Sequence, residues 1–219
     1  MIMREKFQYD LQELQSKLKE LGDLTANALT LSVQALTNQN IDLALKIIED
    51  DVKVDQLEEE INDLAILLIA KQQPVAIDLR RIVTTIKIAA DIERMADFAV
   101  NIAKSTIRIG NEPFIKPIEH IKQMQKLSTE MLSLSIQAFL EEDTVVAKKV
   151  ADMDDQVDDL YGQVIRDLFN LIQSEYQYIS QMTQLAFVAR YLERIGDHAT
   201  NISENIFYLV KGRHYQLNK

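Results

Sequence analysis

The chain has 219 residues and a formal net charge of −10, with 34 acidic side chains against 24 basic ones. This charge argues against nucleic-acid binding, which needs clustered positive charge, and no Gly-rich loop or basic run in the sequence offers a phosphate or nucleotide site. The lack of cysteine excludes disulfides, thiolate catalysis and zinc–sulfur sites. The N-terminus lacks the apolar segment of a signal peptide, and no apolar run approaches the ~18 residues of a membrane span.

Only five Gly and three Pro interrupt a chain that is 47% hydrophobic, which indicates long helices with few turns. Apolar residues at alternating spacings of three and four predict a first helix over residues 5–37. After a polar break, a second helix is expected over 41–72. Gln73 ends it, because the residue before a proline avoids helical geometry, and Pro74 then opens a third helix that reaches about residue 108.

The second half of the chain has the same plan. Gly110, Pro113 and Pro117 form the most conspicuous break in the sequence. A fourth helix is expected over 118–140, a fifth between the connections 141–144 and 174–180, and a sixth that ends at a basic last turn followed by a C-cap glycine. No alternating pattern indicates a strand.

The last helix of each half carries the same motif. Glu93-Arg94-Met95-Ala96-Asp97 recurs as Glu193-Arg194-Ile195-Gly196-Asp197, with every position displaced by 100 residues. A repeat of this length means that the chain consists of two copies of one supersecondary block. We therefore predict an all-α fold of six helices in two tandem three-helix bundles, with residues 1–110 forming the first bundle and residues 111–219 the second.

Each copy of the motif places Glu, Asp and, four residues further on, Asn along one face of its helix. The preceding helix of each half adds two carboxylates at the same spacing, and a short connection makes the two helices antiparallel neighbours. The carboxylates of each half are therefore expected to converge. The expected ligands are Asp51, Asp55, Glu93 and Asp97 in the first half and Asp154, Asp158, Glu193 and Asp197 in the second, with Asn101 and Asn201 as accessory oxygen donors.

Two interpretations fit these carboxylates. Acidic pairs on helices are mostly solvated surface, and Arg94 and Arg194 have the spacing to pair with Asp97 and Asp197. The alternative is a metal site, because the pairs occur in both halves and border an apolar stripe, where carboxylates without a cation would raise one another's pKa. All-oxygen ligands suit hard cations, so iron, magnesium or manganese is expected. The histidines, each interpreted as a surface residue, are His120, His198 and His214.

The motifs are similar to those of the PhoU family. The second half has the intact signature Glu193-Arg194-Ile195-Gly196-Asp197, and the first half departs from it at Met95-Ala96. The family's Pro-x-Ala-x-Asp-Leu-Arg stands as Pro74-Val75-Ala76-Ile77-Asp78-Leu79-Arg80. The resemblance covers essentially the whole chain and implies regulation rather than catalysis.

By this resemblance the protein acts in the bacterial cytoplasm, beside a phosphate-importing ABC transporter with its ATPase subunit and a membrane sensor histidine kinase. It would help to repress phosphate-starvation signalling when phosphate is plentiful. The resemblance also implies metal clusters, of iron or magnesium, at the acidic pairs. We further expect a homodimer that is at most peripheral to a membrane.

Two other classes stay open at the level of sequence. A carboxylate-bridged, metal-dependent hydrolase or oxidase would use the same ligands, but it would need an open coordination position and a substrate cleft. The Glu-x-x-His motif of di-iron bundles is absent. A metal-free helical scaffold would need only the apolar seams. Metal analysis separates the scaffold from the other two classes, and turnover assays separate the enzyme.

Overall fold

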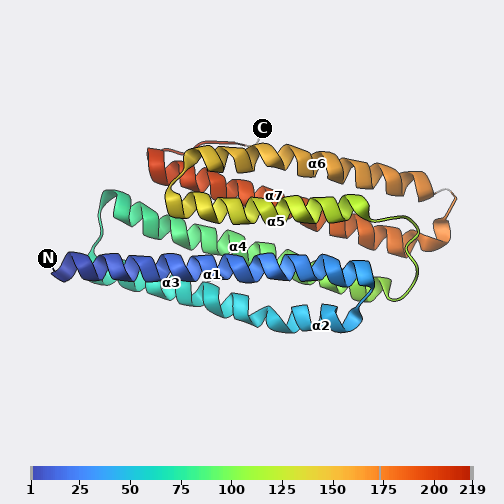
Figure 1. Ribbon diagram of the computed structural model, residues 1–219, viewed down its shortest axis with the longest axis horizontal. Helices are drawn as coiled ribbons and strands as arrows, with labels where there is room; N and C mark the ends of the chain where they lie inside the picture. Colours follow the sequence, from blue (N-terminus) through green and yellow to red (C-terminus); the bar gives the residue numbers. More distant parts are fainter. Residues whose placement is uncertain (1, 173, 218–219) are drawn as a thin grey trace.

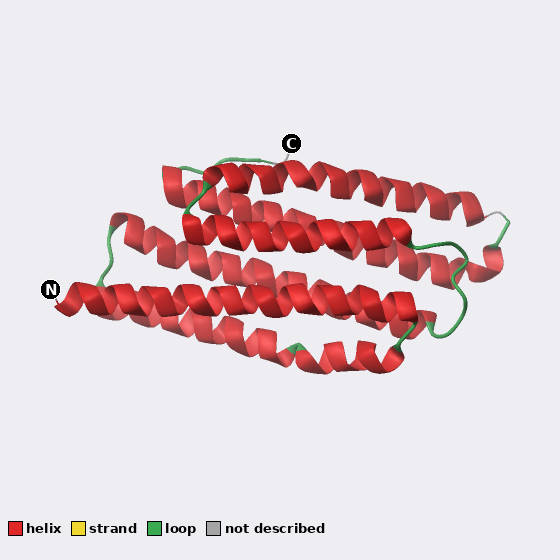
Figure 2. Cartoon of the chain, in the orientation of Figure 1, coloured by secondary structure: helices red, strands yellow, loops and turns green. Residues whose placement is uncertain are grey.

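The computed structural model describes residues 2–172 and 174–217, and within them it is helical and contains no strand (Figure 2). The all-α prediction is confirmed. The helices are α1 (Ile2–Asn38), α2 (Ile41–Asp50), α3 (Val52–Gln72), α4 (Ala76–Ile109), α5 (Glu119–Glu141), α6 (Thr144–Ile172) and α7 (Ile179–Lys211), with a 3₁₀ turn over Tyr176–Tyr178. Because α2 and α3 are two parts of one expected helix, the six-helix plan holds with one added break.

That break lies at Asp51. Its backbone keeps helical angles (φ −59°, ψ −33°) and joins the two helices directly. The carbonyl of Asp51 accepts hydrogen bonds from both Val54 N (2.8 Å) and Asp55 N (3.2 Å). The first bond spans three residues, as in a 3₁₀-helix, so this one turn is tighter than an α-helical turn and the chain bends there without a loop. A second difference concerns Pro74, which lies outside α4: the helix begins at Ala76, and Val75 is its N-cap.

The helices form two three-helix units that lie side by side (Figure 1). In the first unit α1, α3 and α4 pack on one another, with α2 against α1 and α4; in the second, α5, α6 and α7 do the same. The most extensive contact in the molecule joins α4 to α7, and α1 also packs on α5. The two units therefore share one continuous core, to which Leu21, Ile92, Leu132 and Ile195 all contribute fully buried side chains.

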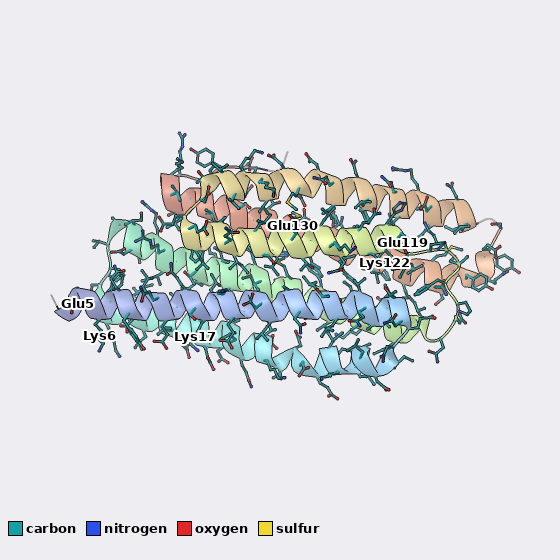
Figure 3. The ribbon with its side chains drawn as sticks, in the orientation of Figure 1. Glu5, Lys6, Lys17, Glu119, Lys122 and Glu130 are labelled. Carbon is teal, nitrogen blue, oxygen red and sulfur yellow. The ribbon has the colours of Figure 1, made fainter. Side chains whose placement is uncertain are left out.

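The two units also meet at Gly22 of α1, which lies against Ile136 of α5. A Cβ atom at this position would lie 1.9 Å from Cδ1 of Ile136 on α5, so the absence of a side chain lets the two helices meet. Elsewhere the face formed by α1 and α5 is charged, with Lys17 paired to Glu60 (2.7 Å) and other charged side chains directed to solvent (Figure 3). None of the described helices combines the length and apolarity that crossing a bilayer requires.

The α4–α7 contact reflects the internal repeat. Asp91 of α4 contacts His198 of α7, with Oδ1 2.8 Å from Nδ1. Phe98 of α4 stacks on Tyr191 of α7, with ring centroids 5.9 Å apart. Positions 91 and 191 are equivalent in the repeat, and so are positions 98 and 198. The contact between 91 and 198 therefore recurs as the contact between 98 and 191, with α4 and α7 exchanging places. This pairing occupies one flank of each helix and leaves Glu93, Asp97 and their counterparts on the other flank.

Candidate functional site

The first acidic cluster lies where α3 meets α4. Asp51, Glu93 and Asp97 are half-buried, and Asp55 is exposed. Burial raises the pKa of Asp51 to about 6, and the charges of Asp55 and Asp97 add to the rise while Lys104 opposes it. The pKa of Glu93 is also raised, mainly by burial and next by the charge of Asp97. The structure therefore brings the four expected carboxylates of the first half close enough to repel one another.

The second cluster lies where α6 meets α7. Burial raises the pKa of both Asp158 and Glu193, and in each case the charge of Asp197 is the next largest cause. The Glu193 side chain is only 12% exposed, and its Oε1 accepts a hydrogen bond from Arg190 (2.5 Å). Its Oε2 is buried and accepts no hydrogen bond from any described residue; Nε of Arg194 lies 3.9 Å away. A buried carboxylate oxygen without a hydrogen bond has the character of an open ligand.

Asp154 is placed differently from the other ligands. Its side chain is 4% exposed and lies against the backbone of α7 at Gly196, where a Cβ atom would be 2.4 Å from Asp154 Oδ1. In the first half Ala96 stands at the position of Gly196, and Asp51, the counterpart of Asp154, stays half-buried at the α2–α3 break. The glycine of the signature thus lets one carboxylate of the second cluster enter the interior.

Arginines compensate part of this negative charge. Nη1 of Arg94 donates to Asp97 (2.8 Å), and Nη1 of its counterpart Arg194 donates to Asp197 (3.0 Å), as the sequence spacing predicts. The Arg94 side chain is 62% exposed, and exposed ion pairs contribute little free energy. The pKa of Glu93 and that of Glu193 stay raised in spite of these pairs, so both clusters keep an excess of negative charge.

The carboxylates do not form a closed ligand shell. Across residues 2–172 and 174–217, no three His, Cys, Asp or Glu side chains converge closely enough to hold a metal ion. Asn101 and Asn201, one turn beyond the carboxylates, have half-buried and exposed side chains respectively. The donor set nevertheless suits a hard cation, because it consists of carboxylate oxygens and includes the buried, unbonded Oε2 of Glu193.

Two features of the site were not anticipated from the sequence. Arg190 pairs with Glu193, whereas the corresponding position 90 in the first half is alanine. The separation of three residues between Arg190 and Glu193 could have revealed this pair in the sequence. His198, interpreted as a surface residue, is half-buried between the two units and pairs with Asp91. It lies on the flank of α7 away from the Glu193–Asp197 stripe.

Comparison with known proteins identifies the family. The PhoU domain matches residues 18–106 and 121–206, one copy in each three-helix unit. A Clostridium acetobutylicum protein described as a phosphate-specific transport system accessory protein PhoU homolog is 38% identical over 98% of this chain and 99% of its own length. An Aquifex aeolicus protein of the same description is 39% identical over 93% of this chain and 92% of its own.

Solved structures agree with this assignment. The crystal structure of PhoU from Pseudomonas aeruginosa superposes with a TM-score of 0.90 at 31% identity, covering 94% of this chain and all of that one. The phosphate transport system regulatory protein PhoU from Streptococcus pneumoniae also gives 0.90, at 28% identity, over 96% of this chain and 99% of its own. The sequence motifs, the paired three-helix units and these similarities lead to one conclusion: the chain belongs to the PhoU family.

Proposed function

We propose that this protein is an accessory and regulatory protein of phosphate transport rather than an enzyme. The observation that carries this proposal is the match of both three-helix units, over nearly the full chain, to relatives described as phosphate-specific transport system accessory proteins. In this role it acts in the cytoplasm as a homodimer and contacts the ATPase subunit of a phosphate ABC transporter and a sensor histidine kinase. It helps to repress phosphate-starvation signalling when phosphate is plentiful.

We further propose that the two acidic clusters each hold a hard cation, of iron, magnesium or manganese. The second cluster gives the strongest support, because Glu193 keeps a buried oxygen without a hydrogen bond beside Asp158 and Asp197. There Asp158 and Asp154 of α6 would act with Glu193 and Asp197 of α7. The first cluster would use its own four carboxylates, from α3 and α4.

The chemistry that a cation supplies here is neutralisation of charge. The carboxylates come from two helices in each unit, so a shared positive charge would tie α3 to α4 and α6 to α7. The raised pKa of Asp51, Glu93, Asp158 and Glu193 supports this proposal, since carboxylates that burial and repulsion destabilise gain most from a cation. Asn101 and Asn201 would be accessory oxygen donors.

Partner recovery and a reporter test the regulatory role together. The tagged protein is purified from cells of its own host grown with and without phosphate, and a phosphate-starvation reporter is measured in a strain that lacks the gene. We expect the transporter ATPase subunit and the kinase to co-purify, and the reporter to rise in phosphate-rich medium until the wild-type gene is restored. An unchanged reporter in the deletion strain, with neither partner recovered, would contradict the proposal.

A further inference from the structure

Arg80, the last residue of the Pro74–Arg80 motif, has no role in the acidic clusters. It is half-buried where the beginning of α4 meets the end of α7. Its Nη1 lies 3.3 Å from the point where a Cβ atom of Gly212, the C-cap of α7, would stand. Its Nε is buried and has no hydrogen-bond partner among the described residues. The neighbouring Arg81, by contrast, is paired with both Asp78 (2.8 Å) and Glu142 (2.5 Å).

Two other basic groups lie near the end of α7. Lys87 lies two turns after Arg80 on α4, and its Nζ is 5.7 Å from the centre of the Tyr208 ring. The segment that follows α7 folds back so that His214 stacks on Tyr208, with ring centroids 4.4 Å apart and planes 5° from parallel. None of these three basic side chains forms an ion pair with a carboxylate in the part of the chain that the structure describes.

The buried Nε of Arg80 is a donor without a hydrogen bond in the ligand-free protein. A buried donor without a partner is unfavourable, and an acceptor oxygen on a ligand would remove this penalty. The seven-residue separation of Arg80 and Lys87 corresponds to about 10 Å along α4, a gap that two long side chains can close around one small anion. The sequence shows no basic run here because His214 lies more than 130 positions from Arg80.

We propose that Arg80, Lys87 and His214 form a binding site for a phosphate-type oxyanion. Arginine offers a planar fork that matches two oxygens of a tetrahedral anion, and lysine adds a compact charge. Three basic groups, two from α4 and one from the segment that follows α7, favour a doubly charged anion over chloride or a single carboxylate. The site stands apart from both acidic clusters and does not depend on a metal.

The competing explanation is structural. Basic side chains near the C-terminus of a helix interact favourably with its dipole, and Arg80 and Lys87 both lie beside the last turn of α7. This explanation predicts that removing either charge lowers thermal stability whether or not an anion is present, and it predicts no anion binding. The two explanations therefore differ in the effect of an anion on each variant.

The test is calorimetric titration of inorganic phosphate into chelator-treated protein at low ionic strength, so that no metal mediates binding. Arg80→Gln and Lys87→Gln each remove one charge, and circular dichroism checks their fold. Arg108→Gln is the matched control, because Arg108 is an exposed arginine at the other end of α4, about 40 Å away. We expect wild type and Arg108→Gln to bind phosphate equally, and the other two variants to bind at least about tenfold more weakly.

The proposal is overturned if wild-type protein binds no phosphate at about 10 mM, the range of a weak but specific site. It is also overturned if Lys87→Gln and a folded Arg80→Gln bind as tightly as wild type. Phenyl phosphate distinguishes the two sources of the anion. If phenyl phosphate binds as tightly as inorganic phosphate or more tightly, the site recognises a phosphoryl group carried on another molecule. If phenyl phosphate does not bind, the site recognises free phosphate.

Discussion

Gly196 is the residue at which the two acidic clusters differ most. A methyl group here would meet Asp154 Oδ1, 2.4 Å from the Cβ position, so Gly196→Ala must displace a buried carboxylate. We expect a net loss of about 1–2 kcal/mol in the free energy of unfolding, because steric strain in a packed site exceeds the ~1 kcal/mol that alanine adds to a helix. Urea denaturation measures the change.

Ala96→Gly provides the control for this substitution. At the equivalent position of the first unit it loses helix propensity, about 1 kcal/mol, and the burial of one methyl group, about 0.8 kcal/mol, because Ala96 is 1% exposed. A Gly196→Ala variant that is as stable as wild type would contradict the prediction, because Asp154 would then withdraw from α7 at a cost no larger than the ~1 kcal/mol gained in helix propensity.

Asp51 gives the metal-free protein a defined pH dependence. Burial, then Asp55 and Asp97, raise its pKa from 3.8 to about 6. Between these values the folded state binds more protons than the unfolded state, so stability falls as pH rises from about 4 to 6, and the penalty is complete above 6. Asp51→Asn should therefore stabilise the protein at pH 7 by about 1 kcal/mol after allowance for solvent screening.

Chemical denaturation in the presence of chelator, at pH 7 and again near pH 3.5, checks this prediction. The gain of Asp51→Asn over wild type should largely vanish at the lower pH, where Asp51 is protonated in the folded state and mostly protonated in the unfolded state. An equal gain at the two pH values would show that the asparagine acts through packing and not through charge.

The identities of the cluster residues could be predicted from sequence, and their environments could not. Repeat and spacing place Glu193 and Asp197 on one helical face, because helical periodicity alone decides that. The inward position of Asp154 depends on how closely α6 approaches α7, which is a property of tertiary packing. The contact of Asp91 with His198 likewise requires knowing that α4 and α7 are neighbours.

At the scale of elements, the helices follow from the apolar periodicity and their ends from Pro, Gly and polar breaks. The expected span 5–37 agrees with α1 (Ile2–Asn38), and 118–140 with α5 (Glu119–Glu141), to within three residues. The break at Asp51 was not predictable, because Val52, Val54 and their neighbours continue the helical pattern and no Gly or Pro interrupts it. At this break the backbone hydrogen bonds change while the φ and ψ angles of Asp51 stay helical. Such a change requires no particular residue type, so the sequence does not reveal it.

Gln181 forms hydrogen bonds with the backbone of the connection between the two units. Gln181, at the beginning of α7, is 3% exposed; its Oε1 accepts from Ile115 N (2.8 Å) and its Nε2 donates to Pro113 O (3.1 Å). Gln181→Ala would leave both backbone groups without a partner, so we expect a loss of about 1–3 kcal/mol. It should also speed limited proteolysis within residues 110–118. Gln177→Ala removes an exposed glutamine four residues earlier and should change neither property; equal effects of the two variants would refute this assignment.

At the scale of the whole molecule, we predict that the two units unfold as one domain. Their apolar side chains form one continuous cluster that includes Leu21, Ile92, Leu132 and Ile195, and α4 packs on α7 along the boundary between the repeats. We expect a single cooperative transition in urea, with coincident curves from circular dichroism and tyrosine fluorescence. Two separated transitions, or fragments 1–110 and 111–219 that each fold alone, would show that the repeats are independent.

The central claim is that the acidic clusters hold cations, and thermal unfolding with and without metal tests it most directly. Wild-type protein is compared with the double variant Glu193→Ala with Asp197→Ala, first in chelator and then after addition of Mg²⁺, Mn²⁺ or iron. A ligand at 100 times its Kd stabilises the native state by about 2.7 kcal/mol, so at least one cation should raise the Tm of wild type.

The variant should be no less stable than wild type in chelator, because like charges four residues apart are unfavourable, and it should lose the part of the metal-dependent rise that belongs to the second cluster. The equivalent change in the first unit, Glu93→Ala with Asp97→Ala, should remove the other part. Full metal-dependent stabilisation in both variants, or none in wild type with any of these cations, would show instead that the carboxylates are only a charged helix face.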